Sequence, residues 1–324
     1  MPPDPRPSLN RRQFIQSVTA AGLLLPTVGQ AISPPSRREP ATTPTLCIFS
    51  KHLHWLSVPD MAQRVADMGF AGIDLTVRRG GHVPPERVAD ELPKAVALIR
   101  RAGLDVPMIA TDVINPDDPL TEPLLKTAAQ LGIAHYRTGY LDYDRTLGVA
   151  KSLDRHRQQL RKLAALNQTY GIHGAYQNHS GTRVGAAVWD LWELLKDIDP
   201  QWLGCQYDIM HAVAEGGQSW VNGLDALKSH IRCVDLKDFI WASKDGKWQH
   251  QLVPLGEGMV DFGAYFARLK GYNFTGPMSI HYEFPLGGAE TGQRRLTVPP
   301  DTVIAAFTRD LRKVRTLLKQ AQFE

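Results

Sequence analysis

The sequence has few cysteines, no long uninterrupted apolar segment and little excess of either charge. Its three cysteines, Cys47, Cys205 and Cys233, each lie in an apolar run, which favours buried free thiols over a disulfide framework. A formal net charge of +4 is too small to predict a nucleic-acid partner or an anionic membrane surface. With 43% hydrophobic and 22% charged residues, the 324-residue chain can still bury a substantial core.

Two glycine-rich signatures are also missing. No Gly-x-Gly-x-x-Gly turn follows the first expected strand, residues 46–50, which argues against a dinucleotide-binding fold. Apart from Gly287-Gly288, no glycine-rich cradle follows the last two expected strands, where barrels often bind phosphate. Neither a bound dinucleotide nor a phosphorylated substrate is therefore indicated.

The N-terminus is typical of an export signal. Arg11 and Arg12 precede an apolar stretch over residues 18–28, and residues 29–31 supply the small side chains that signal peptidase prefers. The arginine pair followed by Phe14 resembles a twin-arginine signal, which implies a periplasmic destination. Because the apolar stretch is too short to span a bilayer, we expect no stable membrane span; a retained anchor is the alternative to cleavage.

From residue 45 onward, short apolar runs alternate with amphipathic helical patterns. The expected strands are 46–50, 71–76, 105–111, 134–138, 172–177, 203–208, 231–237 and 278–283. The expected helices are 58–68, 85–102, 120–131, 149–170, 188–198, 224–230, 261–269 and 302–319. This rhythm predicts one α/β domain, a (β/α)8 barrel over residues 45–324, preceded by an export signal at 1–31 and a flexible linker at 32–44. An open doubly wound sheet is the alternative.

Two long insertions follow the seventh and eighth expected strands. They span residues 241–259 and 285–300, and both are rich in aromatic residues or proline. Since the loops after barrel strands lie over the C-terminal mouth, we expect these insertions to form loops or a lid there. A dimer contact is the other interpretation, so the oligomeric state stays open.

Polar side chains gather where the expected strands end. They are Lys51, His52 and His54 after the first strand, His82 after the second, Asp112 after the third, Arg137 on the fourth, Gln177, Asn178 and His179 on the fifth, Asp208 and His211 on the sixth, Asp235, Lys237 and Asp238 on the seventh, and His281 and Glu283 on the eighth. Because strand side chains alternate, Asp235 and Lys237 share one side of their strand. So many titratable groups around one axis cost desolvation energy, which indicates a ligand site.

Over residues 45–320 the chain resembles the xylose isomerase-like TIM barrels, and more narrowly the sugar phosphate isomerase/epimerase group. The similarity is carried by Gln177-Asn178-His179, Asp208-x-x-His211, Asp235-Leu236-Lys237-Asp238 and the segment 255–261. It implies a divalent metal held by Glu, Asp, His and Glu on strands five to eight. This chain has Gln177, Asp208, Asp235 and His281 there, so that only Asp208 matches. We expect these four residues to form a weaker site for manganese, magnesium or zinc.

The resemblance implies an exported isomerase or epimerase that removes a proton beside the carbonyl of a sugar or keto-sugar, a small-molecule carbohydrate. Relatives use two metal-bound glutamates as acid and base. Gln177 cannot transfer a proton, so one-base chemistry is the expectation. His281 or Glu283 would be the base, while Lys237 and His211 would polarise or hold oxygens. The residues expected to bind substrate are His54, His82, Arg137, Gln177, Asn178 and His179.

Three other interpretations stay open. Related barrels include lyases that cleave 3-keto-glycosides by β-elimination, and a periplasmic protein suits a glycoside. A non-catalytic sugar-binding barrel would explain the missing carboxylate at Gln177. A hydrolase with paired carboxylates would use two of Asp208, Asp235 and Glu283.

Overall fold

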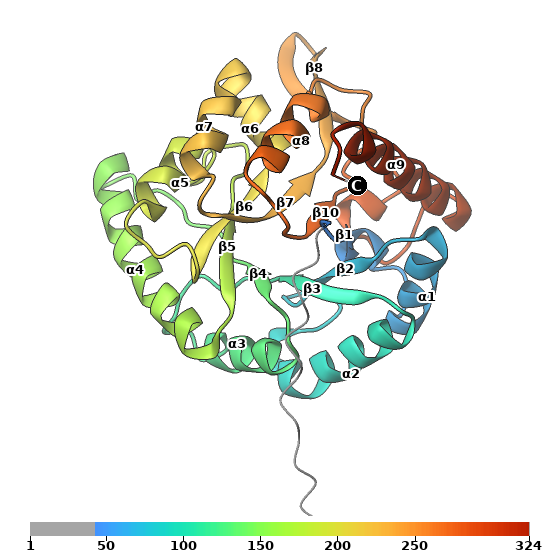
Figure 1. The fold of residues 1–324 in the computed structure, drawn as a ribbon, viewed down its shortest axis with the longest axis horizontal. Coiled ribbons are helices and arrows are strands. Elements are labelled where there is room, and N and C mark those ends of the chain that lie inside the picture. Colours follow the sequence, from blue (N-terminus) through green and yellow to red (C-terminus); the bar gives the residue numbers. More distant parts are fainter. Residues whose placement is uncertain (1–42, 324) are drawn as a thin grey trace, which may run out of the picture. The chain divides into compact units, whose positions relative to one another are not determined.

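Parallel strands close into a barrel in the computed structural model, which describes residues 43–323 (Figure 1). The barrel strands are β1 (Leu46–Phe49), β2 (Gly72–Thr76), β3 (Asp105–Ala110), β4 (His135–Arg137), β5 (His173–Gln177), β6 (Leu203–Asp208), β7 (Ile231–Leu236) and β10 (Met278–Ile280). Their order around the ring is β1-β10-β7-β6-β5-β4-β3-β2. The predicted (β/α)8 barrel is confirmed, and the open sheet is excluded. The expected signal at 1–31 and nearly all of the linker at 32–44 lie outside the described residues.

Helices surround the strands (Figure 1). They are α1 (Val58–Met68), α2 (Val88–Arg101), α3 (Thr121–Gln130), α4 (Gly148–Tyr170), α5 (Val188–Leu195), α6 (Ile209–Gly216), α7 (Trp220–Leu227), α8 (Phe262–Gly271) and α9 (Pro300–Gln320), with short 3-10 turns η1 (Ser50–Leu53), η2 (Pro85–Arg87), η3 (Gly217–Ser219) and η4 (Ala289–Thr291). Helix α1 shows how the sequence sets these limits. Ser57 caps its first turn, and Gly69 ends it with a left-handed φ of 92°.

A small apolar cluster lies apart from the main core. Met108, Ala175 and Cys233 form this buried cluster. They lie on alternate strands β3, β5 and β7, as in the side-chain layers that fill such barrels. All three cysteines are free and buried, as predicted.

The insertion at 241–259 was expected to be a loop or a lid. It is mostly a β-hairpin. Strand β8 (Asp238–Lys244) pairs antiparallel with β9 (Lys247–Val253) outside the barrel. Asp245 and Gly246 connect them with φ values of 52° and 73°, the positive angles that a two-residue hairpin turn needs. The strands were not expected because their side chains are mostly exposed and lack the apolar alternation of a half-buried strand.

Helix α6 was also not expected. The sixth strand ends at Asp208, and the next residue already begins the helix. The Asp208 carboxylate accepts a hydrogen bond from the His211 N–H at 3.3 Å and so caps this helix. One residue therefore ends a strand and starts a helix, which leaves no turn signal between them. Among residues 43–323, no helix is both long and apolar enough to cross a membrane.

Candidate active site

A buried lysine lies among the carboxylates at the strand ends. Lys237 follows β7 and is only 2% exposed. Its Nζ lies 3.1 Å from Asp208 Oδ2 and 3.1 Å from Glu283 Oε2. Lys51 Nζ is 2.8 Å from the other oxygen of Glu283. We call Lys51, Lys237, Asp208 and Glu283 the lysine–carboxylate cluster.

This pairing fixes the charges of the cluster. Burial alone would lower the pKa of Lys237, but the carboxylates of Asp208 and Glu283 outweigh it and raise that pKa. Burial alone would raise the pKa of Glu283, but the two lysines hold it well below its usual value. Lys237 is therefore an ammonium rather than a Schiff-base nucleophile. Both carboxylate oxygens of Glu283 are held in ion pairs with lysines, which disfavours the base role expected for it.

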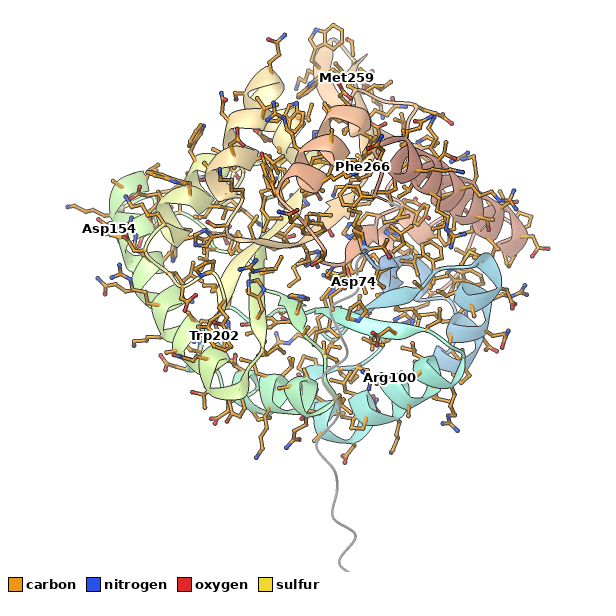
Figure 2. The ribbon with its side chains drawn as sticks, in the orientation of Figure 1. Asp74, Arg100, Asp154, Trp202, Met259 and Phe266 are labelled. Atoms are coloured by element: carbon orange, nitrogen blue, oxygen red, sulfur yellow. The ribbon has the colours of Figure 1, made fainter. Side chains whose placement is uncertain are left out.

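A second buried cluster lies on β2, β7 and the end of β10. Asp74, Asp235 and His281 each offer a ligand atom, and these atoms lie within 4.8 Å of one another. Figure 2 shows Asp74 near the middle of the ring of helices. His281 Nε2 lies 3.1 Å from Asp235 Oδ1, and its ring stacks on Phe49 with centroids 4.4 Å apart. These three residues form the carboxylate–histidine cluster.

The carboxylate–histidine cluster leaves polar atoms unsatisfied. Asp74 Oδ2 accepts from the Ser279 hydroxyl at 2.9 Å, but Asp74 Oδ1 has no hydrogen-bond partner in the described part of the chain, and neither ring nitrogen of His281 has one. Burial raises the pKa of Asp74 and of Asp235 to about 7 and lowers the pKa of His281 well below its usual value. Asp235 accepts from Gln206 Nε2 at Oδ1 and from Gln177 Nε2 at Oδ2, so the unsatisfied carboxylate oxygen is that of Asp74. A neutral imidazole and two carboxylates are ligand types that a divalent metal accepts.

Gln177 lies between the two clusters, and both its amide oxygen and its amide nitrogen are hydrogen-bonded. Its Oε1 accepts from Arg137 Nη1 at 3.2 Å and from the Tyr140 hydroxyl. Its Nε2 donates to Asp208 Oδ2 at 2.9 Å and to Asp235 Oδ2 at 2.6 Å. The amide thus turns N–H groups, not oxygen, toward the carboxylates.

Two of the four expected metal ligands, Asp235 and His281, lie together with Asp74. The Gln177 oxygen accepts from Arg137 and Tyr140, and the Asp208 carboxylate pairs with the Lys237 ammonium. The geometry therefore favours Asp74, Asp235 and His281 as a metal set, and the ligand roles expected for Gln177 and Asp208 stay predictions.

Two histidines lie beside the lysine–carboxylate cluster. The rings of His179 and His211 have centroids 4.0 Å apart. His211 Nδ1 is 2.9 Å from the Ser180 hydroxyl, and its Nε2 is 3.6 Å from Asp208 Oδ2. Burial lowers the pKa of His211 well below its usual value and that of His179 to about 4. Both imidazoles are therefore neutral at pH 7.

Asn178, which was expected to bind substrate hydroxyls, makes hydrogen bonds within the protein. Its Nδ2 donates to the backbone oxygen of Asp208 at 2.9 Å, and its Oδ1 accepts from the Asp208 N–H at 2.8 Å. The side chain is fully buried. Both amide groups are used to fasten β5 to the end of β6, which is a structural role.

The expected substrate residues His54 and His82 lie on another side of the mouth. Both approach the Thr76 hydroxyl, His54 Nε2 at 3.0 Å and His82 Nδ1 at 3.2 Å. Burial lowers their pKa values to about 4 and about 3. His82 Nε2 is buried without a partner among the described residues. No direct contact joins this pair to Lys237 within residues 43–323.

A family model described as the xylose isomerase-like TIM barrel matches residues 62–297. The chain belongs to this family. Its structure is similar to the apo form of 3-keto-D-glucoside 4-epimerase from E. coli, with a TM-score of 0.60 and 14% identity over 84% of this chain and 99% of that one. It is also similar to a xylose isomerase-like TIM barrel protein from Mycobacterium smegmatis in complex with magnesium, with a TM-score of 0.61 and 15% identity over 86% and 98%.

A sequence relative is an uncharacterized protein from Methanocaldococcus jannaschii. It is 27% identical over 135 residues, which are 41% of this chain and 44% of that protein. The match therefore spans less than half the length of that relative. It adds no activity to the assignment.

One segment that carried the family resemblance has a structural role in this xylose isomerase-like barrel. The Asp238 carboxylate accepts hydrogen bonds from the N–H groups of Gly256, Gly258 and Val260 at 2.9–3.1 Å, which holds the chain after the hairpin. A Cβ on Gly258 would lie 2.2 Å from Asp238 Oδ1, so only glycine fits there. Segment 255–261 thus shapes the barrel rim.

The site residues predicted from the strand ends did not include Asp74, Tyr140 and Arg78. Asp74 occupies the middle of β2, where all five residues are fully buried. A carboxylate inside a buried strand was the available signal, because such a group needs a partner. Tyr140 and Arg78 lie in loops after strands, where the sequence offers no periodicity to direct their side chains.

Proposed function

We propose that this barrel removes a proton beside the carbonyl group of a sugar or keto-sugar, as an isomerase or epimerase. One observation carries the proposal. A charged ammonium, Lys237 Nζ, and a neutral imidazole, His211 Nε2, approach the same oxygen of Asp208 at 3.1 Å and 3.6 Å. Enolisation needs this combination, a positive group for the carbonyl oxygen and a base for the adjacent proton.

Each residue then has one task. Lys237 donates a hydrogen bond to the carbonyl oxygen and stabilises the negative charge that develops there. His211 accepts the proton at Nε2, while the Ser180 hydroxyl holds its other ring nitrogen. Asp208 positions Lys237 through their ion pair and His211 through the hydrogen bond from the His211 backbone N–H. With Gln177 in place of a glutamate, the same base delivers the proton to the neighbouring carbon on the same face, which gives one-base isomerisation; epimerisation would need a second proton donor on the opposite face.

We also propose that Asp74, Asp235 and His281 hold a divalent metal, with magnesium, manganese and zinc as candidates. The unsatisfied buried atoms of Asp74 and His281 support this assignment, and so does the closeness of Asp235 to both. Bound there, a metal would supply Lewis-acid polarisation of a substrate oxygen. Ser279 orients Asp74, and the stack on Phe49 fixes the His281 ring.

Solvent exchange tests the proposed reaction. The purified protein is incubated in D2O with 3-keto-D-glucose, D-tagatose, D-psicose, D-glucuronate or D-galacturonate, with and without Mn²⁺, and deuterium at carbon is followed by NMR. We expect deuterium beside the carbonyl and a new isomer for at least one sugar. Lys237→Met and His211→Gln should abolish both signals, whereas Asp154→Asn, at an exposed aspartate on α4, should retain them. Absence of exchange with every sugar and metal would overturn the proposal.

Two outcomes of that assay identify the alternatives. Release of the aglycone from a 3-keto-glycoside, without an isomer, would replace the isomerase by a β-eliminating lyase. Sugar binding without exchange or cleavage would leave a binding barrel.

We further propose that residues 1–31 direct export to the periplasm and that residues 45–324 are the exported barrel. The Arg11-Arg12 pair, the apolar stretch at 18–28 and the small residues after it support this proposal. A fusion of residues 1–44 to a reporter that is active only in the periplasm should give activity. Replacing both arginines by lysine should remove it, and an unchanged signal would contradict the twin-arginine route.

A further inference from the structure

Three arginines line one cavity at the barrel mouth. The cavity has a volume of about 280 Å³ and is lined by Arg78, Arg137, Arg183 and Tyr140, together with Asp112 and Asp142. Arg137 ends β4, and the other two arginines lie in loops after β2 and β5. Tyr140 donates to Gln177, which donates to Asp208. The cavity therefore opens beside the proposed reaction site.

Arg78 is a half-buried cation without a counterion. Its side chain makes no ion pair or hydrogen bond within residues 43–323. Its Cζ lies 5.5 Å from the centroid of the Phe49 ring, a contact that orients the guanidinium but does not neutralise it. Burial, and next the charge of Arg137, lower the pKa of Arg78. The N–H groups of the Arg78 guanidinium are therefore available to bind a ligand.

Arg137 lies behind Arg78 on the same ring. Its Cζ is 5.0 Å from the Phe49 centroid, and the residue is only 4% exposed. Nη1 donates to the neutral Gln177 amide, while Nε is buried with no partner in the described chain. Asp74 and Asp235 act on it electrostatically, but neither lies within ion-pair distance. An unpaired buried N–H of this kind indicates a missing acceptor.

The acidic residues of the lining limit the charge of that acceptor. Asp142 lies 3.7 Å from Arg183, and both side chains are more than half exposed. Asp112 is exposed and accepts from the Arg79 backbone N–H at 3.3 Å. Three arginines and two aspartates leave a net charge of +1 (3 − 2 = 1). A lining with that charge suits one negative charge better than two.

We propose that the substrate is a sugar acid and that Arg78 and Arg137 bind its carboxylate in this cavity. The proposal rests on the proposed function, since the carboxylate would hold the reacting carbon toward Lys237 and His211. A planar carboxylate matches the paired N–H groups of a guanidinium. Phosphate, a dianion near neutral pH, is disfavoured by Asp112 and Asp142.

Binding measurements test this proposal independently of turnover. Full-length protein is titrated in a calorimeter with D-glucuronate, D-galacturonate, D-glucose, D-galactose and glucose 6-phosphate. At least one uronate should bind about tenfold or more tightly than its neutral counterpart, as expected for charge-assisted hydrogen bonds. In Arg78→Gln that ratio should fall to about one. Arg79→Gln is the matched control, because Arg79 is adjacent in sequence but lines a different cavity.

Thermal melts show whether the variants fold. Arg78→Gln should melt at or above the wild-type temperature, because it removes an unpaired charge next to Arg137. Equal binding of uronates and neutral sugars by the wild type would overturn the proposal, as would tighter binding of glucose 6-phosphate or an unchanged ratio in a folded Arg78→Gln. Uronate binding without deuterium exchange would contradict the proposed function and leave the carboxylate site standing.

Discussion

The lysine–carboxylate cluster and the carboxylate–histidine cluster both lie at the mouth of the barrel. The central residues of both clusters are buried. In the first, Lys237 meets two carboxylates at 3.1 Å each, and Lys51 meets the free oxygen of Glu283. In the second, one oxygen of Asp74 and both ring nitrogens of His281 have no hydrogen-bond partner among the described residues. Only the second cluster is incomplete.

The two clusters differ in how their buried charges are satisfied. Buried charges need partners, and the chain supplies its own cation, Lys237, at Asp208. No ion pair with a lysine or arginine joins Asp74 or Asp235 within residues 43–323, which is why we propose a cation there. Gln177 keeps the two apart, because its N–H groups bind one carboxylate of each cluster.

Removal of the Lys237 ammonium should have the largest effect. In Lys237→Met, the carboxylates of Asp208 and Glu283 lose their shared partner, so the free energy of unfolding should fall by about 3–5 kcal/mol. Urea denaturation measures this change. Lys51→Met is the comparison, since its pair with Glu283 is 18% and 23% exposed and Lys237 still pairs with Glu283 when Lys51 is removed, so a smaller loss of about 1–2 kcal/mol is expected. Equal losses of unfolding free energy in the two variants would show that Lys237 contributes no more to stability than Lys51.

Metal addition should distinguish the clusters next. Mn²⁺ at about 100 times its Kd should stabilise the wild type by about 2.7 kcal/mol, measured as a rise in Tm. Asp74→Asn should lose this response, because it removes one charged ligand, whereas the exposed control Asp112→Asn should keep it. A wild type that ignores Mn²⁺, Mg²⁺ and Zn²⁺ would contradict the metal assignment.

Gln177→Glu should remove the hydrogen bonds that join the two clusters. It replaces two N–H donors by a carboxylate beside Asp208 and Asp235, so stability without metal should fall by about 1–3 kcal/mol. Mn²⁺ should recover part of that loss, because the glutamate restores the family ligand. A variant as stable as the wild type in metal-free buffer would show that the amide orientation does not matter.

Tyr140→Phe should have the smallest effect. The change removes one of the two donors to Gln177 Oε1 and leaves Arg137 in place, so about 1 kcal/mol of stability should be lost. The Asp74–Asp235–His281 site should bind Mn²⁺ as before. A large fall in metal affinity would mean that Tyr140 supports the second cluster through Gln177.

The barrel was predictable because its strands are buried on both faces and its helices carry one apolar face. Apolar runs and terminating glycines such as Gly69 therefore mark the elements directly. The exposed hairpin strands β8 and β9 give no such pattern, although the Asp245-Gly246 turn was a readable signal. Helix α6 was missed because Asp208 belongs to both the strand and the helix cap.

The sequence alone determined that polar residues of parallel strands meet at one end of the barrel. It did not determine which of them become partners. Strands in a closed barrel are tilted and staggered, so residues at similar positions along different strands lie at different heights. Asp74, inside β2, therefore reaches His281, while Asp208, at the end of β6, reaches Lys237. Only the tertiary structure could decide that the Asp208 carboxylate is paired with a lysine while one oxygen of Asp74 has no partner among the described residues.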